Sequence, residues 1–174
     1  RELAQTLAEA GHRVIVACPY VANPKAPLFE GEAEQIGNVE IPVGAATLPF
    51  SLYRRKVGDV EYVLYRDPAG ILHQKTYPTH KVGGKIYSDS PYGYVESIVL
   101  SQMGMYVARA RRINVNAFHF NDWQVGLGPV YMEEIYRHDP AFAPFIGAAG
   151  TVDIGHNYAY QGVFGHHRKR VGSL

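Results

Sequence analysis

A carboxylate and an indole stand side by side in the segment from His119 to Trp123, where Asp122 directly precedes Trp123. This pairing suits a sugar, because a carboxylate accepts hydrogen bonds from hydroxyl groups and an indole packs against the C–H face of a sugar ring. The alternative is structural: Asp122 would only cap the next helix, and Trp123 would only fill the core. The segment by itself leaves both interpretations open.

A second group of hydrogen-bonding side chains lies near the carboxyl end of the sequence. It occupies the segment from Gly155 to Gly162 and includes His156, Asn157, Tyr158, Tyr160 and Gln161. A loop of this composition can orient a hydroxylated substrate, or it can be a surface loop whose tyrosines pack. These two interpretations also remain open at this point.

Composition excludes several other kinds of protein. Lys and Arg total 17 and Asp and Glu total 16, a formal charge of +1, so no basic surface for nucleic acid is expected. The single cysteine, Cys18, rules out an intrachain disulfide and a thiolate zinc site, which favours the cytoplasm. The apolar run from Val14 to Cys18 is far shorter than the ~20 residues that span a bilayer, so no membrane passage is expected.

The elements expected in the first part of the chain form an α/β beginning. Apolar spacing predicts a helix over residues 1–11, ending at Gly11, and then a strand over residues 12–19 buried on both faces. A short strand is expected over residues 38–43. Residues 50–66 alternate on both sides of a Gly-Asp pair, which predicts a β-hairpin.

The second part of the chain places both polar segments directly after predicted strands. An amphipathic helix is expected over residues 92–112, a strand over 113–119, a helix over 124–137 and a strand over 151–155. Pro129 is expected near the first turn of its helix. Because ligands collect at the carboxyl ends of parallel strands, these two segments are the candidate site.

Three blocks of this sequence resemble the bacterial glycogen synthase and plant starch synthase family. They run from Glu2 to Tyr20, from His119 to Tyr131 and from His156 to Phe164, in the order and spacing of that family. Tyr87-Ser-Asp89 is similar to the family's Tyr-x-Asp segment before a long helix. The resemblance is thinner between about Pro24 and Lys85.

The resemblance implies that residues 1–174 are an incomplete N-terminal catalytic domain of a two-domain GT-B glycosyltransferase. Its fold would be a Rossmann-like parallel sheet with helices on both faces and an inserted β-hairpin. The first strand with its glycine-rich loop, and the C-terminal nucleotide-binding domain, are expected to lie outside this sequence. We therefore expect the isolated fragment to be inactive.

The family's reaction is the retaining transfer of glucose from ADP-glucose to the non-reducing end of an α-1,4-glucan, glycogen or starch. By resemblance, ADP-glucose and the glucan would be the partners, and no metal or cofactor is expected, since ADP-glucose is a substrate. Localisation would be cytoplasmic, or plastidial in a plant or alga. The alternative hypothesis is a non-catalytic or remodelled GT-B relative that binds glucan without transferring sugar.

The resemblance also implies roles for single residues. Asp122 would lie by the donor glucose and the acceptor, and His156 would lie beside the reacting sugar and hold its hydroxyl group. Substrate binding would further involve Tyr87, Trp123, Asn157, Tyr160 and Gln161. The family's usual His-x-His-Asp-Trp-His pattern is changed here at two positions, Asn121 and Gln124.

Overall fold

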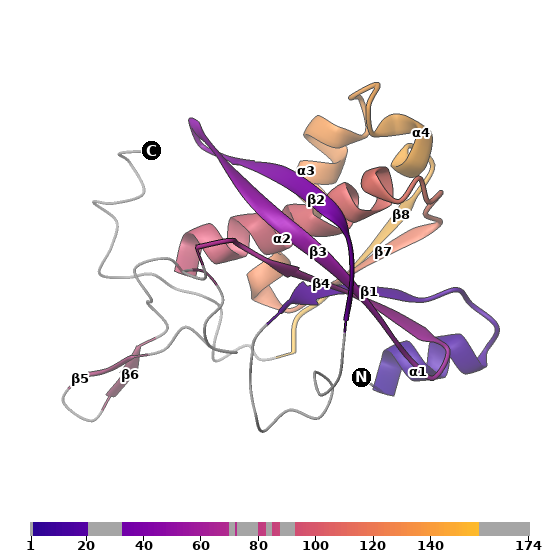
Figure 1. Cartoon of the computed structure of the whole chain (residues 1–174), viewed down its shortest axis with the longest axis horizontal. Coiled ribbons are helices and arrows are strands. Elements are labelled where there is room, and N and C mark those ends of the chain that lie inside the picture. Colours follow the sequence, from indigo (N-terminus) through magenta and orange to yellow (C-terminus); the bar gives the residue numbers. More distant parts are fainter. Residues whose placement is uncertain are drawn as a thin grey trace. The chain divides into compact units, whose positions relative to one another are not determined.

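A computed structural model of the chain describes residues 2–20, 33–69, 72, 80–82, 85–87 and 93–156 (Figure 1). The chain divides into two compact units, which we describe separately. The N-terminal unit comprises Arg1–Glu40 and Pro49–Thr76, and the C-terminal unit comprises Ile41–Leu48 and Tyr77–Leu174. None of the helices in the described ranges combines the length and the hydropathy that crossing a membrane requires.

A four-stranded mixed sheet with the order β1-β4-β3-β2 lies mostly in the N-terminal unit, and the β2–β3 turn with the adjoining strand ends, Ile41–Leu48, belongs to the C-terminal unit. Strand β1 (Ile15–Pro19) runs parallel to β4 (Val60–Arg66), whereas β3 (Ala46–Val57) is antiparallel to β4, and β2 (Glu34–Val43) lies beyond β3. The predicted hairpin over residues 50–66 is thus confirmed as β3 and β4. Its turn contains Gly58 at φ +58°, a left-handed conformation that favours glycine.

Helix α1 (Glu2–Glu9) packs on one face of this sheet. Ala4 and Ala8 are four residues apart and therefore lie on the same side of the helix. Both pack against a buried cluster formed by alternate residues of β4: Val60, Tyr62 and Leu64. The helix ends as predicted, with Gly11 at φ +90° just after its last turn.

Strand β1 differs from the prediction in its burial. The β-branched run predicted a strand buried on both faces, but each residue of β1 is only half-buried. The reason is its place in the sheet: within the described strands, β1 lies at an edge and its one neighbour is β4. An apolar run that would suit a central strand is therefore compatible with an edge position.

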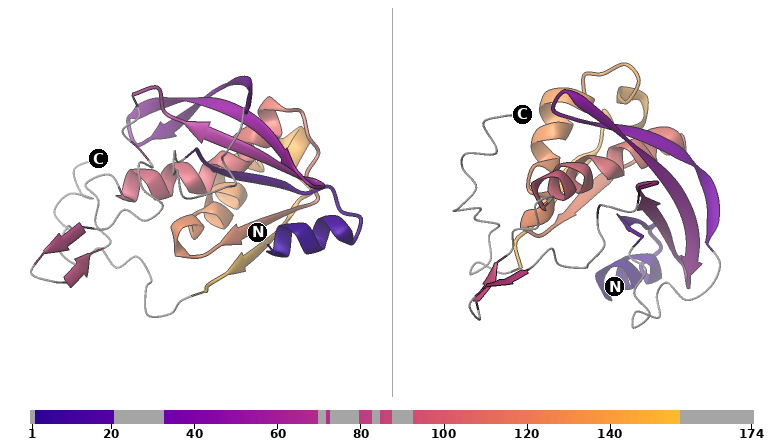
Figure 2. Two further views of the ribbon diagram at one scale, coloured as in Figure 1. Left: turned by 60° about the horizontal axis from the view of Figure 1, so that its bottom comes forward. Right: turned by 60° about the vertical axis from the view of Figure 1, so that its left-hand side comes forward.

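The C-terminal unit contains the long helix α2 (Gly93–Ala110) and a two-stranded parallel sheet of β7 (Ala117–Asn121) and β8 (Gly150–Ile154). Figure 2 shows β7 and β8 side by side. A short antiparallel pair, β5 (His80–Val82) and β6 (Lys85–Tyr87), belongs to the same unit. The α/β class is confirmed, with parallel pairing present in both the four-stranded sheet and the β7–β8 pair.

Strand β7 begins four residues later than the predicted strand over residues 113–119. The preceding backbone amides are used elsewhere: Ile113 N donates to Ala108 O at the end of α2, and Val115 N donates to Phe145 O. These residues therefore close the helix and anchor a neighbouring turn instead of pairing with β8. As a result, Asn121 belongs to the strand and not to the loop after it.

Close packing fixes β7 against the helices around it. A Cβ on Gly104 of α2 would come within 3.4 Å of the Phe118 ring, and one on Gly128 would lie 2.1 Å from the Phe120 ring. Alanine would fit poorly at Gly128 in particular, because the aromatic ring occupies the space of its side chain. Phe118 therefore packs against α2 at Gly104, and Phe120 packs against α3 at Gly128.

The helix predicted over residues 124–137 is divided into three shorter turns. A 3₁₀ turn, η2 (Trp123–Val125), is followed by α3 (Gly128–Tyr131) and by a π-helical turn, η3 (Met132–Tyr136). Pro129 lies in the first turn of α3, as predicted, where its missing N–H costs no hydrogen bond. A further short helix, α4 (Ala143–Ile146), precedes β8.

A buried aromatic cluster stabilises the helices of the C-terminal unit. Tyr106 of α2 makes edge-on ring contacts with Tyr136 and Phe142, and the Arg109 guanidinium lies 4.8 Å and 4.4 Å from the Tyr106 and Phe142 ring centres. The Tyr136 hydroxyl group donates to Gln102 Oε1. Burial raises the pKa of Tyr136, so this hydroxyl remains a donor.

Candidate active site

The carboxyl ends of β7 and β8 coincide. Their parallel register begins at Ala117 and Gly150 and ends at Asn121 and Ile154. Because the two strands stop at the same level, the residues that follow them emerge at one edge of the pair. Both polar segments that the sequence singled out start there, with Asp122 after β7 and His156 after β8.

Asp122 is held in a strained backbone conformation. Its φ of 72° and ψ of 173° lie in a region that is essentially restricted to glycine, at a cost of roughly 1–3 kcal/mol for other residues. A hydrogen bond of 2.7 Å from Asp122 N to Ile154 O fixes this conformation by tying the residue to the end of β8. Strain of this kind is concentrated at active sites and ligand clamps.

Asp122 also caps the 3₁₀ turn η2, since its Oδ1 accepts a hydrogen bond of 2.9 Å from Trp123 N. The structural interpretation of this residue is therefore partly confirmed. Capping does not explain the strain, however, because capping residues ordinarily adopt β-region backbone angles with negative φ. The positive φ of Asp122 therefore has a cause other than capping.

Trp123 and its turn are anchored to α2. The Ser101 hydroxyl group, itself buried, donates to the backbone oxygen of Gln124 over 3.4 Å. Val125 is buried, whereas Trp123 and Gln124 are half-buried. Both interpretations of the Trp123 side chain therefore stay open.

His156 contacts the end of the neighbouring strand. Its Nε2 lies 2.8 Å from Asn121 Oδ1, and both residues are exposed. The sequence marked Asn121 only as a change from the family's pattern and did not predict this contact. The available signal was the expectation that both strands end at the same edge, which places the last residue of one beside the loop after the other.

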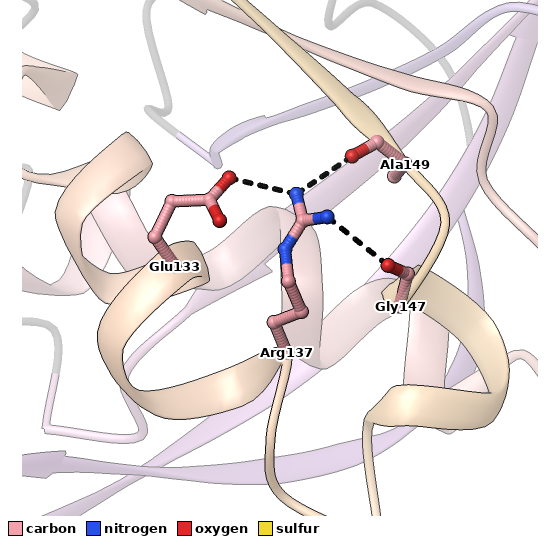
Figure 3. A network of polar contacts seen from close by, with 4 residues as sticks. All are labelled: Glu133, Arg137, Gly147 and Ala149. Atoms are coloured by element: carbon pink, nitrogen blue, oxygen red, sulfur yellow. Dashed lines mark hydrogen bonds and ion pairs between the residues drawn. The ribbon is translucent and has the colours of Figure 1, made fainter.

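Arg137 fixes the chain segment that enters β8 (Figure 3). Its two terminal nitrogens donate to the backbone oxygens of Gly147 and Ala149 over 3.1 Å and 2.8 Å. The guanidinium also forms a 2.7 Å ion pair with Glu133, one turn earlier on the same helical segment. Arg137 thus anchors the segment that enters β8, a contact that no pattern in the sequence indicated.

The structure describes the predicted site residues unevenly. Tyr87 is the last residue of β6, and its backbone alone is described. Asn157, Tyr160 and Gln161 lie outside the described residues. Within the described part of the chain, no three His, Cys, Asp or Glu side chains come together as metal ligands would.

These elements define an α/β domain with a polar site at the carboxyl ends of parallel strands, where such folds bind ligands. The family model of the starch synthase catalytic domain matches residues 1–173 of this chain. The chain belongs to the starch synthase catalytic domain family.

Curated relatives agree with this assignment. The chain is 50% identical to a glycogen synthase of Thermotoga petrophila over 150 residues, which covers 83% of this chain and 29% of the relative. It is 28% identical to glycogen synthases of Thermotoga maritima, over 150 residues, and of an Anaeromyxobacter species, over 167 residues, which covers 83% and 93% of this chain. The chain spans 29% and 31% of the length of these two relatives.

A solved structure shows the same fold. The catalytic domain of starch synthase IV from Arabidopsis thaliana, bound to ADP and acarbose, superposes with a TM-score of 0.63 at 12% sequence identity. The match covers 91% of this chain and 29% of that chain. It confirms the predicted α/β fold, similar to that of a GT-B starch synthase.

Proposed function

We propose that this chain is the N-terminal part of a glycogen or starch synthase, a retaining glycosyltransferase that moves glucose from ADP-glucose to the non-reducing end of an α-1,4-glucan. Its family and the glycogen synthases among its relatives support this reaction. A structural neighbour bound to ADP and acarbose supports an adenine nucleotide as the leaving group. The chain spans 29% and 31% of the length of two of these glycogen synthases, so the proposed reaction is that of the full-length enzyme.

The strained Asp122 at the joint end of β7 and β8 is the observation that carries this proposal. Retaining glucosyl transfer builds positive charge at the anomeric carbon while the nucleoside diphosphate leaves. Fixed polar groups must therefore be in position before the bond breaks. Asp122 supplies a carboxylate there, and Trp123 supplies an aromatic face beside it. His156 forms a hydrogen bond with a hydroxyl group of the same sugar.

The substitution Asp122→Asn removes the negative charge of the carboxylate but keeps a side chain that can cap η2. Asparagine caps helical turns as well as aspartate and has nearly the same shape, so the backbone strain stays the same and the change in the free energy of unfolding should stay within about 0.5 kcal/mol. In a chain that covers the full length of the curated relatives, we expect kcat for glucose transfer from ADP-glucose to glycogen to fall about 100-fold or more.

Asp59→Asn is the matched control, because Asp59 is an exposed residue of the hairpin turn in the N-terminal unit. It should leave turnover unchanged. Near wild-type turnover in Asp122→Asn would contradict the role of this residue. Glucan binding by the wild-type enzyme without any incorporation of glucose would instead favour the non-catalytic alternative.

A further inference from the structure

Asn121 and His156 form a side-chain contact between the ends of two parallel strands. Asn121 is the last residue of β7, in register with Ile154, and His156 follows Ile154 by two positions. The hydrogen bond from Asp122 N to Ile154 O holds the two chain segments together at this level. The backbone on both sides of the contact is therefore held in place, and Asn121 Oδ1 lies 2.8 Å from His156 Nε2.

The chemistry of the two groups determines where the imidazole carries its proton. An amide oxygen can only accept a hydrogen bond, so His156 Nε2 must be the donor in this contact. In a neutral imidazole the other nitrogen, Nδ1, is then an acceptor. The carboxamide of Asn121 has no ionisable proton, and it remains an acceptor over the whole physiological pH range.

The role inferred for the Asn121–His156 contact rests on the proposed function. We propose that Asn121 is a positioning residue that holds His156 with Nδ1 as the atom presented to a hydroxyl group of the bound sugar. A sugar hydroxyl can donate to Nδ1 without any change of tautomer. The ring is thus oriented before substrate arrives, which lowers the entropy that must be lost in the transition state.

The first test reads the proton position directly in the 174-residue chain. Isotope-labelled protein is studied by nuclear magnetic resonance, and His156→Gln identifies the signal of this ring. The wild-type chain should show a one-bond proton–nitrogen correlation at Nε2, because the hydrogen bond to Asn121 slows exchange with water. Asn121→Asp, which keeps an acceptor of the same shape, should retain the correlation, and Asn121→Leu should lose it.

Asn114→Leu is the matched control, because Asn114 is an exposed asparagine in the segment before β7. It should leave the Nε2 correlation unchanged. Thermal unfolding of all variants shows whether each remains folded. A proton on Nδ1 of wild-type His156, or an unchanged correlation in a folded Asn121→Leu variant, would overturn the proposal.

The second test separates positioning from substrate binding in a chain of the full length of the relatives. Asn121→Leu should lower kcat about five- to tenfold, the value of one lost hydrogen bond, with little change in KM. Asn121→Asp should recover most of this loss. An unchanged kcat in Asn121→Leu, in an enzyme that Asp122→Asn inactivates, would overturn the positioning role. If the wild-type enzyme transferred no glucose, the proposed function would fail, while the proton position would still be decided by the first test.

Discussion

At the scale of single residues, the arrangement after β8 predicts a specific kinetic effect for His156. On the proposed role of Asn121, the ring of His156 acts mainly by its position in the transition state. In a chain of the full length of the relatives, we expect His156→Ala to lower kcat about 100-fold while it raises the KM for ADP-glucose less than about threefold. Steady-state kinetics measure both constants. The reverse pattern would make His156 a residue that only binds the ground state.

A second residue-scale prediction concerns Cys18 in β1. The residue is half-buried, and desolvation of its thiol raises the pKa to about 12, whereas the thiol of the unfolded chain ionises near its ordinary value. Because the folded pKa is the higher one, the contribution of this group to stability is complete below pH of about 9 and is lost as the pH rises towards 12.

Urea unfolding at a series of pH values measures this effect. Between pH of about 9 and 12, the stability of the wild type should fall relative to Cys18→Ala by up to about 1.4 kcal/mol per pH unit. The difference between the two proteins removes the contribution of all other titrating groups. Parallel stability profiles would show that the thiol is not desolvated in the folded chain.

At the scale of elements, Arg137 links the π-helical turn η3 to the segment that enters β8. Replacement by Met keeps the length of the side chain but removes its hydrogen bonds to Gly147 O and Ala149 O. We expect a loss of about 2–3 kcal/mol in the free energy of unfolding, since both bonds come from a charged donor and both carbonyls lose their partner.

Glu133→Gln is the control for Arg137→Met, because it removes the ion pair and leaves the two backbone contacts in place. The Glu133 side chain is 48% exposed, so this variant should lose less than about 0.5 kcal/mol. Denaturant titration compares the two variants. Equal losses would indicate that the ion pair, and not the contact with the β8 entry, is what stabilises this region.

At the scale of the whole molecule, the 174-residue chain should have no transferase activity by itself. The two-domain architecture expected from the sequence places the reaction between the domains, and this chain covers 29% of a glycogen synthase to which it is 50% identical. Incubation with ADP-glucose and glycogen should therefore give no incorporation of glucose. A chain of the full length of the relatives, assayed in parallel, is the positive control, and transfer by the shorter chain would contradict the two-domain interpretation.

Much of the local structure follows from the sequence, because it depends on residues close together in the chain. Helices α1 and α2, the β3–β4 hairpin and the place of Asp122 at the end of a strand follow from apolar spacing, turn residues and proline positions. The three blocks that resemble starch synthases also predicted the family whose model matches residues 1–173. These features are set by neighbouring residues and do not depend on contacts with distant parts of the chain.

Only the tertiary structure decides the contacts between distant segments. The edge position of β1 depends on which strands join its sheet, and the strain at Asp122 depends on a hydrogen bond to Ile154. Asn121 and His156 are 35 residues apart, so no local pattern could pair them. Their contact exists because β7 and β8 run parallel and stop at the same level, and this register is set by packing and backbone hydrogen bonding across the whole unit.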